Sequence, residues 1–154
     1  MYNNSTMIGN IGEASAIYQF SKRNIPVSIP FGQNVPYDMI IQVSDKLYKI
    51  QCKTTKISYE DKMIFNITRT NGFTNIHTPY TYKEIDFFYL HCVQNGYCGL
   101  VNIKEVPSRE FVLRLTRPKN NQRINIHYAK DYDLDIQLQK ILYSNMIKPF
   151  TIAI

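Results

Sequence analysis

Hydrophobic residues near the start of the chain recur with the period of a helix. Between residues 9 and 23, four of them fall within one broad arc at spacings of three and four: Ile11, Ala14, Ile17 and Tyr18. Such an arc is typical of a helix that packs on a core, and the basic residues that follow suit the end of the helix dipole. Gly9 and Gly12 weaken this prediction because glycine is a poor helix former, and Pro26 ends the helix.

A strand-like pattern follows the proline. Residues 25–31 can supply a short extended segment, and residues 38–43 and 47–54 are apolar runs separated by the turn sequence Ser44-Asp45-Lys46. Because side chains alternate along a strand, the second run presents two faces, one with Tyr48, Ile50 and Cys52 and the other with Lys49, Gln51 and Lys53. The pattern predicts a hairpin of two strands.

The rest of the chain adds strands and a closing helix. A third strand is predicted over residues 62–68, with Met63, Phe65 and Ile67 on one face, followed by a polar, aromatic-rich loop over 70–82 that turns once into helix near Tyr82. Further predicted elements are strands over residues 85–92 and 97–103 around Gln94-Asn95-Gly96, a short strand over 111–115, a basic loop over 118–123 and a helix over 132–143. That helix carries apolar residues on one side: Leu134, Leu138, Ile141 and Leu142. This order predicts one α/β domain over residues 1–154, a mixed sheet with flanking helices.

Composition narrows the class of protein. Hydrophobic residues make up 44% and charged residues 19% of the 154 residues, which favours a folded globular chain. The net charge of +6 favours a polyanionic partner such as DNA or RNA. Three cysteines without CxxC spacing predict neither a disulfide framework nor a zinc site. With no long apolar run and no signal-peptide pattern at the start, we expect no membrane contact and a soluble, cytoplasmic protein.

One group of polar residues carries candidate chemistry. Asp38 begins the first strand of the hairpin, and Gln51 and Lys53 share a face of the second. Folding the hairpin can therefore bring an acid, an amide oxygen and an ammonium to one edge of the sheet. Hard cations such as Mg²⁺ bind oxygen ligands, and Lys53 beside such a site can stabilise charge on phosphate. Glu13, near the start of the first helix, can add a second carboxylate, and the Cys52 carbonyl another oxygen.

These residues resemble a known nuclease signature. Asp38, Gln51 and Lys53 look like the PD-(D/E)XK motif, with Tyr37 after the proline and Gln in place of the acidic residue. Further segments are similar to the small group I intron homing endonucleases of cyanobacterial type: Gly12-Glu13, Pro36-Tyr37-Asp38, Gln51-Cys52-Lys53, Ile85-Asp86-Phe87-Phe88-Tyr89, Arg114 and Asn120-Asn121-Gln122. The resemblance extends from Ile11 to about Asp131.

The resemblance implies a restriction-endonuclease-like fold and an endonuclease that cuts double-stranded DNA with Mg²⁺, for which Mn²⁺ substitutes. It also implies a homo-oligomer, a dimer or a tetramer, and 5′-phosphate and 3′-hydroxyl products. Carried over residue by residue, Glu13, Asp38, Gln51 and Lys53 are catalytic, and Asp38, Gln51 and the Cys52 carbonyl bind the metal. The neutral Gln51 gives the site one negative charge fewer than the usual motif.

Simpler interpretations stay open for each residue. Asp38 can belong to a turn beside a proline, Gln51 and Lys53 to the wet face of a strand, and Glu13 to a helix start that favours carboxylates. We interpret His77, His91 and His127 as structural because they lack metal-ligand spacing. Candidates for DNA contact are the following cations: Lys56, Arg69, Arg114, Arg117, Lys119 and Arg123.

Other functions on the same fold also stay open. Gln51 can mark a decayed site in a non-catalytic DNA-binding protein. Within the nucleases, a junction resolvase or a restriction-type enzyme fits the same residues.

Overall fold

The computed structural model describes residues 4–32, 34–71, 73–120 and 124–147. Its elements in chain order are α1 (Ser5–Lys22), β1 (Val27–Ser28), β2 (Met39–Val43), β3 (Lys46–Thr55), β4 (Lys62–Asn66), β5 (Thr68–Thr70), β6 (His77–Pro79), β7 (Phe87–Cys92), β8 (Cys98–Asn102), η1 (Ile103–Glu105), β9 (Glu110–Arg114), β10 (His127–Tyr128), η2 (Ala129–Tyr132) and α2 (Leu134–Met146). None of the described helices is long and apolar enough to cross a membrane.

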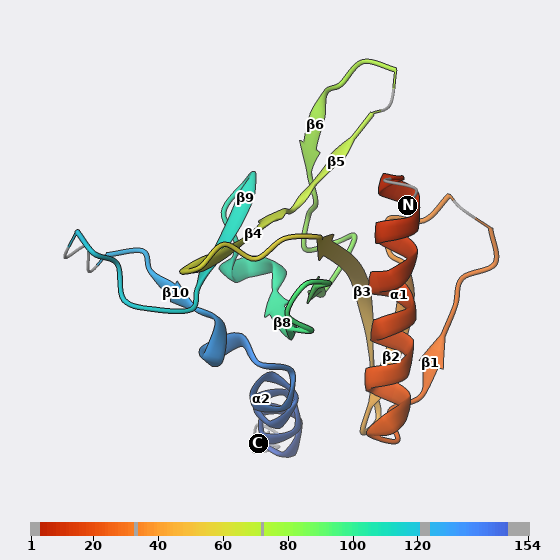
Figure 1. The fold of residues 1–154 in the computed structure, drawn as a ribbon. Coiled ribbons are helices and arrows are strands. Elements are labelled where there is room, and N and C mark those ends of the chain that lie inside the picture. The colour runs from red at the N-terminus through yellow and green to blue at the C-terminus, as the bar shows by residue number, and fades with distance from the viewer. Residues whose placement is uncertain (1–3, 33, 72, 121–123, 148–154) are drawn as a thin grey trace, which may run out of the picture.

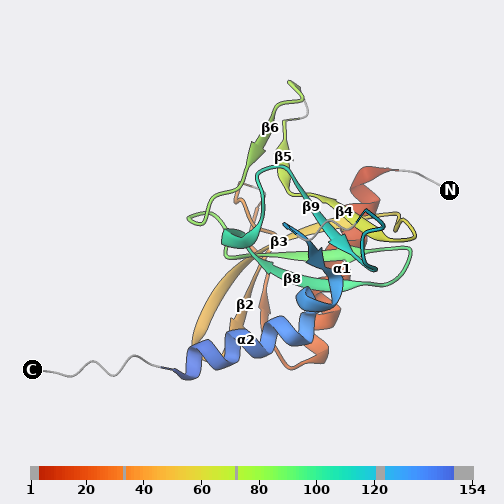
Figure 2. The same ribbon diagram turned by 90° about the vertical axis from the view of Figure 1, so that its left-hand side faces the viewer.

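The main sheet has the strand order β1-β2-β3-β7-β8 and is mixed, because β3 pairs with β7 in parallel while its other pairs are antiparallel. Strands β10, β9 and β4 form a second sheet, and β5 and β6 form a two-stranded ribbon that projects from the body (Figures 1 and 2). The mixed α/β sheet with flanking helices predicted from the sequence is confirmed.

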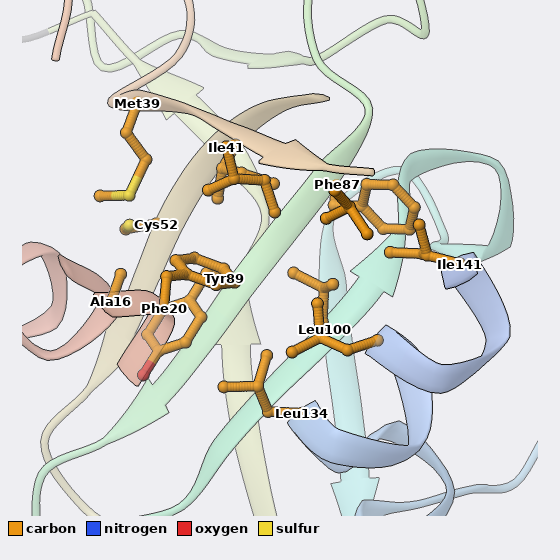
Figure 3. Packing of buried hydrophobic residues seen from close by; sticks show 13 residues of the cluster. Ala16, Phe20, Met39, Ile41, Cys52, Phe87, Tyr89, Leu100, Leu134 and Ile141 are labelled. Atoms are coloured by element: carbon orange, nitrogen blue, oxygen red, sulfur yellow. The ribbon is translucent and has the colours of Figure 1, made fainter. Parts of the chain in front are cut away.

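Two hydrophobic clusters lie on opposite faces of β7, and all six of its residues are buried. Phe87 and Tyr89 belong to the cluster that α1 and α2 cover, and Figure 3 shows residues of both helices reaching it. Phe88 and Leu90 belong to the cluster that the second sheet covers. Both helices therefore contribute to one cluster of the main sheet, and β-strands cover the other.

Helix α1 begins earlier than predicted and buries a different face. Of the predicted apolar arc, Ile11 is 44% exposed and Tyr18 is 60% exposed. The buried side carries small residues and one ring instead: Gly12, Ala16 and Phe20. The arc prediction was wrong because α1 approaches β3 too closely for larger side chains: a Cβ on Gly12 would lie 1.8 Å from Thr54 Oγ1. The glycine that weakened the helix prediction is thus required by packing.

Other predictions differ in detail. On α2, Leu134, Leu138 and Ile141 are buried as expected, but Leu142 is 43% exposed. The predicted third strand does not pair with the hairpin of β2 and β3. It divides into β4, which pairs with β9, and β5, which pairs with β6. The predicted loop over residues 70–82 therefore contains half of this ribbon, and Tyr82 lies in a turn instead of a helix.

Candidate active site

The site lies where the pairing of β2 with β3 ends. The last pair of that ladder is Met39 with Ile50, and Asp38 extends it by donating its backbone N–H to the Ile50 carbonyl at 2.9 Å. The next outward N–H on this edge of β3 belongs to Cys52, and it donates to Asp38 Oδ2 at 2.7 Å. The Asp38 carboxylate thus accepts the backbone hydrogen bond that a paired strand would otherwise accept. Beyond this point, no described strand pairs with this edge of β3.

The side chain of Gln51 also binds at this corner, the place where the pairing of β2 with β3 ends beside Asp38 and Cys52. Its Nε2 donates to Asp38 Oδ2 at 2.7 Å and to the Cys52 carbonyl at 3.3 Å. The amide nitrogen therefore lies between two of the oxygens that the sequence assigned to a metal. Burial raises the pKa of Asp38, although the Cys52 N–H and the Lys53 ammonium oppose that shift.

Lys53 lies two residues further along the same face of β3. Its Nζ donates to the Thr68 carbonyl at 2.7 Å and sits 4.9 Å from the centre of the Tyr80 ring. Burial lowers the pKa of Lys53 to about 8, an effect that Asp38 opposes and Arg69 reinforces. Burial also raises the pKa of Tyr80 to about 12. The ammonium is therefore held in a partly desolvated place beside the aspartate.

Glu13 reaches the same place from α1. It lines one open hollow of about 510 Å³ together with Asp38, Gln51, Cys52 and Lys53. The pKa of Glu13 is raised, first by burial and then by the charge of Asp38. The structure thus brings together all five residues that the sequence proposed for the catalytic and metal site.

The donor atoms of this group fit a hard divalent cation. Within the described parts of the chain, no three His, Cys, Asp or Glu side chains form a metal cluster. The oxygens at hand are instead mixed: two carboxylates, one carboxamide and a backbone carbonyl, all of the type that Mg²⁺ and Mn²⁺ bind. A cation would also offset the repulsion between Glu13 and Asp38. Gln51 can join such a set only with Oε1 in place of the nitrogen that now faces Asp38.

The predicted DNA-contacting cations do not form one cluster. Lys56 lines the same hollow as Asp38. Arg69 lies over the Tyr80 ring at 4.8 Å and pairs with Glu84 at 2.8 Å. The others lie at the end of β9 and in the loop after it, where they line separate hollows: Arg114, Arg117 and Lys119. Arg114 forms an ion pair with Asp61. Arg123 lies outside the described residues.

Histidines and cysteines have structural surroundings. His77 Nδ1 bonds Thr68 Oγ1 at 2.9 Å, and His91 Nδ1 donates to the Tyr97 carbonyl at 3.0 Å. His127 packs on Phe111 with ring centres 4.9 Å apart. All three cysteines are free thiols, with Cys52 and Cys92 buried.

Sequence reasoning missed two partners of Lys53. Thr68 begins β5 and Tyr80 directly follows β6, so both lie at the base of the β5–β6 ribbon, distant along the chain from Lys53. A backbone carbonyl carries no sequence signal, and Tyr80 lies in what the pattern predicted as a loop. Only the path of the ribbon places them against the lysine.

Comparisons with known proteins bear on the family and the fold of this chain. A sequence profile described as PD-(D/E)XK endonuclease matches residues 3–135. The fold is similar to the solved structure of a bacterial homing endonuclease, I-Ssp6803I, with a TM-score of 0.72 and 21% identity over 97% of this chain and 100% of that one. No curated protein sequence matches significantly. Because the profile spans most of the chain and includes the corner at Asp38, Gln51 and Lys53, this chain belongs to the PD-(D/E)XK endonuclease family.

Proposed function

We propose that this protein is a metal-dependent, sequence-selective endonuclease of double-stranded DNA, similar in role to homing endonucleases. It hydrolyses phosphodiester bonds to leave 5′-phosphate and 3′-hydroxyl ends. One observation carries the proposal: Asp38, Gln51 and Lys53 meet at the open edge of β3, beside a hollow that also admits Glu13. If Asp38 only belonged to a turn, or Gln51 and Lys53 only to a solvent-exposed strand face, a second carboxylate and a partly buried ammonium would not be expected beside this edge.

Each residue has a role that follows from its place. Asp38, Gln51 Oε1 and the Cys52 carbonyl would hold Mg²⁺ or Mn²⁺, and a bound ion of this kind acidifies water and adds positive charge beside a phosphate. The Lys53 ammonium stabilises the negative charge that grows on the phosphate during attack. Glu13, whose raised pKa reflects burial and the nearby Asp38, orients the attacking water by accepting its hydrogen bond.

The test compares two lysines on one face of β3. Lys53→Ala should lower the rate of cutting by about 10²–10³-fold, because it removes a preorganised positive charge. Lys49→Ala is the matched control, since the Lys49 ammonium binds the Lys83 carbonyl at 2.6 Å, away from the hollow. A randomised duplex library with Mg²⁺ supplies the target, and gel shifts confirm that both variants bind DNA. Full cutting by Lys53→Ala would remove the assignment.

A second candidate function has an observation in its favour. The Gln51 nitrogen now satisfies Asp38 Oδ2 and the Cys52 carbonyl, as expected of a decayed site in a DNA-binding protein without catalysis. Titration calorimetry separates the two functions. An active site should bind Mn²⁺ with DNA present, and Asp38→Asn should lose that binding. A decayed site should show no metal-dependent heat in either protein.

The assembly and the type of DNA belong to the same proposal. One copy has one candidate site and spans few base pairs, so cutting both strands of a long target requires two or more copies, and symmetric dimers or tetramers are the usual solution. Sedimentation with and without duplex measures the assembly. Comparing linear duplexes with four-way junctions tests the choice of substrate, because a junction resolvase cuts the branched DNA faster. We expect the substrate to be intracellular DNA.

A further inference from the structure

The β5–β6 ribbon projects from the body of the fold (Figures 1 and 2). It consists of Thr68–Thr70, His77–Pro79 and the described residues between them. Each described residue from Thr70 to Pro79 is exposed, and Phe73 is fully so. Neither hydrophobic cluster includes a residue of this outer part. Burial in the core therefore does not explain why the chain makes it.

The ribbon has the chemistry of a surface that touches nucleic acid. No Asp or Glu occurs between Lys62 and Lys83, so the ribbon carries no carboxylate of its own, and Glu84 beyond it is paired with Arg69. Its exposed side chains are mainly hydroxyls and amides, with two apolar side chains near the tip, Phe73 and Ile76. Hydroxyl, amide and imidazole groups can hydrogen-bond base edges, and apolar groups can contact the thymine methyl.

The described residues at the end of the ribbon are held by local hydrogen bonds before any partner binds. Asn71 Oδ1 accepts hydrogen bonds from the backbone N–H groups of Phe73 at 2.9 Å and Thr74 at 3.3 Å. Asn75 adopts a left-handed φ of 54°, and its N–H donates to the Asn71 carbonyl at 2.8 Å. A preorganised loop loses less conformational entropy on binding.

The root of the ribbon touches the candidate catalytic lysine. Thr68, its first residue, accepts the hydrogen bond of Lys53, and Tyr80, which directly follows it, packs against the same ammonium. Arg69 also lies over the Tyr80 ring, 4.8 Å from its centre. A DNA strand whose phosphate lies beside Lys53 therefore has a neighbouring groove within reach of the ribbon.

We infer that the β5–β6 ribbon enters a groove of double-stranded DNA next to the cleaved phosphate and reads its bases, with Phe73 and Thr78 as reading residues. A two-stranded ribbon fits the major groove, which is about 12 Å wide. Thr78 is exposed and pairs with Arg69 across the ribbon, on the face opposite to His77. This inference rests on the proposed function for its substrate, and it adds the element that sets sequence preference.

The experiment selects duplexes by binding, so that it does not depend on cutting. Asp38→Asn protein is incubated with a randomised duplex library, and the preferred sequences are compared after adding Phe73→Ala or Thr78→Ala. Gln139→Ala, an exposed polar position on α2, is the matched control. Each ribbon variant should weaken the preference at one or two adjacent base pairs by roughly tenfold. The control should keep the parent profile, and melting temperatures should agree because the substituted side chains are exposed.

Each outcome decides the inference. An unchanged profile in both ribbon variants overturns it, as does selection of no sequence by the parent. A change in sedimenting mass without a change in profile also overturns it, because the ribbon would then join copies of the chain. If the profile changes but the unsubstituted protein cuts no duplex, the ribbon reads DNA and the proposed nuclease activity is what fails.

Discussion

In each half of β3 one edge of the strand lacks a described partner strand, and the two halves differ in the residues that surround that edge. Its first half pairs with β2 as far as Ile50, and its second half pairs with β7 from Ile50 onwards. Each half therefore has one edge that no strand covers, and an aspartate closes each edge. Asp86 N–H donates to the Lys49 carbonyl, and its carboxylate accepts the Lys49 N–H at 2.8 Å. Asp38 does the same at Ile50 and Cys52.

The surroundings distinguish these two aspartates. Asp38 faces a hollow with Glu13, the Gln51 amide and the Cys52 carbonyl, and burial raises its pKa. Asp86 belongs to a ladder that continues, since its own carbonyl accepts the Ile103 N–H at 3.0 Å. The comparison teaches that an aspartate can close a strand edge as a purely structural device, and that it becomes a candidate metal ligand where other oxygens converge on it.

Exchanging the two aspartates for asparagine should give the largest contrast. Asp38→Asn should lower Mg²⁺-dependent cutting by on the order of 10²–10³-fold, because a charged ligand becomes neutral. Asp86→Asn should retain cutting and lose about 1 kcal/mol of unfolding free energy through a weaker edge hydrogen bond. Cleavage rates and urea unfolding measure both. Equal losses of cutting in the two variants would show that the edges do not differ in function.

The two lysines on this face should differ in how their replacement changes stability. The pKa of Lys53 is lowered to about 8 by burial, so near neutral pH its ammonium form destabilises the fold. Lys53→Met should therefore raise the unfolding free energy at pH 7, by up to about 3 kcal/mol less the lost bond to Thr68. Lys49→Met should bring no such gain.

The pH dependence of that gain has a definite sign. Between pH 8 and 10.5 the unfolded chain holds more protons at Lys53 than the folded chain, so the stability of the unsubstituted protein rises through this range. The advantage of Lys53→Met should shrink accordingly. Urea unfolding at pH 7 and pH 10 measures it, and an advantage that grows with pH contradicts the lowered pKa.

The packing of α1 on the second half of β3 should depend on Gly12. The methyl group of Gly12→Ala would meet Thr54 Oγ1, and such overpacking costs about 1–3 kcal/mol. Cutting should fall with it because Glu13 moves away from Asp38. Adding Thr54→Ala should restore both, since it removes the clash and a buried hydroxyl without a hydrogen-bond partner.

Gly9 is the control for this packing. Nothing lies within 4 Å of a Cβ placed there, so Gly9→Ala should stabilise the helix by about 0.5–1 kcal/mol. Denaturant unfolding of Gly9→Ala, Gly12→Ala and the double variant Gly12→Ala/Thr54→Ala tests whether the contact with Thr54 causes the loss of stability. A double variant no better than Gly12→Ala alone rejects the contact as the cause.

The smallest effect should come from the ring under Lys53. Tyr80→Leu removes a cation–π contact worth about 0.5–1 kcal/mol, while Tyr80→Phe retains the ring. The leucine variant should cut DNA more slowly than the phenylalanine variant and show a shifted pH–rate profile, because Lys53 loses its position. Identical pH–rate profiles for the two variants would mean that the ring does not position the lysine.

The short-range pattern of the chain predicted much of the fold. Alternation along residues 47–54 correctly separated Tyr48, Ile50 and Cys52 from Lys49, Gln51 and Lys53, and the Asn-Gly turn lies in a hairpin with Gly96 at a φ of 71°. It failed for Ile11 and Tyr18, where apolar residues occur on both sides of α1 and the pattern does not say which side meets the sheet. It also failed for residues 70–82, where the second strand of the ribbon is short and fully exposed.

By itself, therefore, the sequence determined which side chains share a strand face, that the chain builds a mixed α/β domain, and which few polar residues can carry chemistry. Only the tertiary structure decided that β3 changes partners at Ile50, that Gly12 allows α1 to approach it, and that Thr68 and Tyr80 hold Lys53. The physical reason is range: alternation and helical period arise from neighbouring residues, whereas an open edge, a close approach and a desolvated ammonium arise from contacts between distant segments.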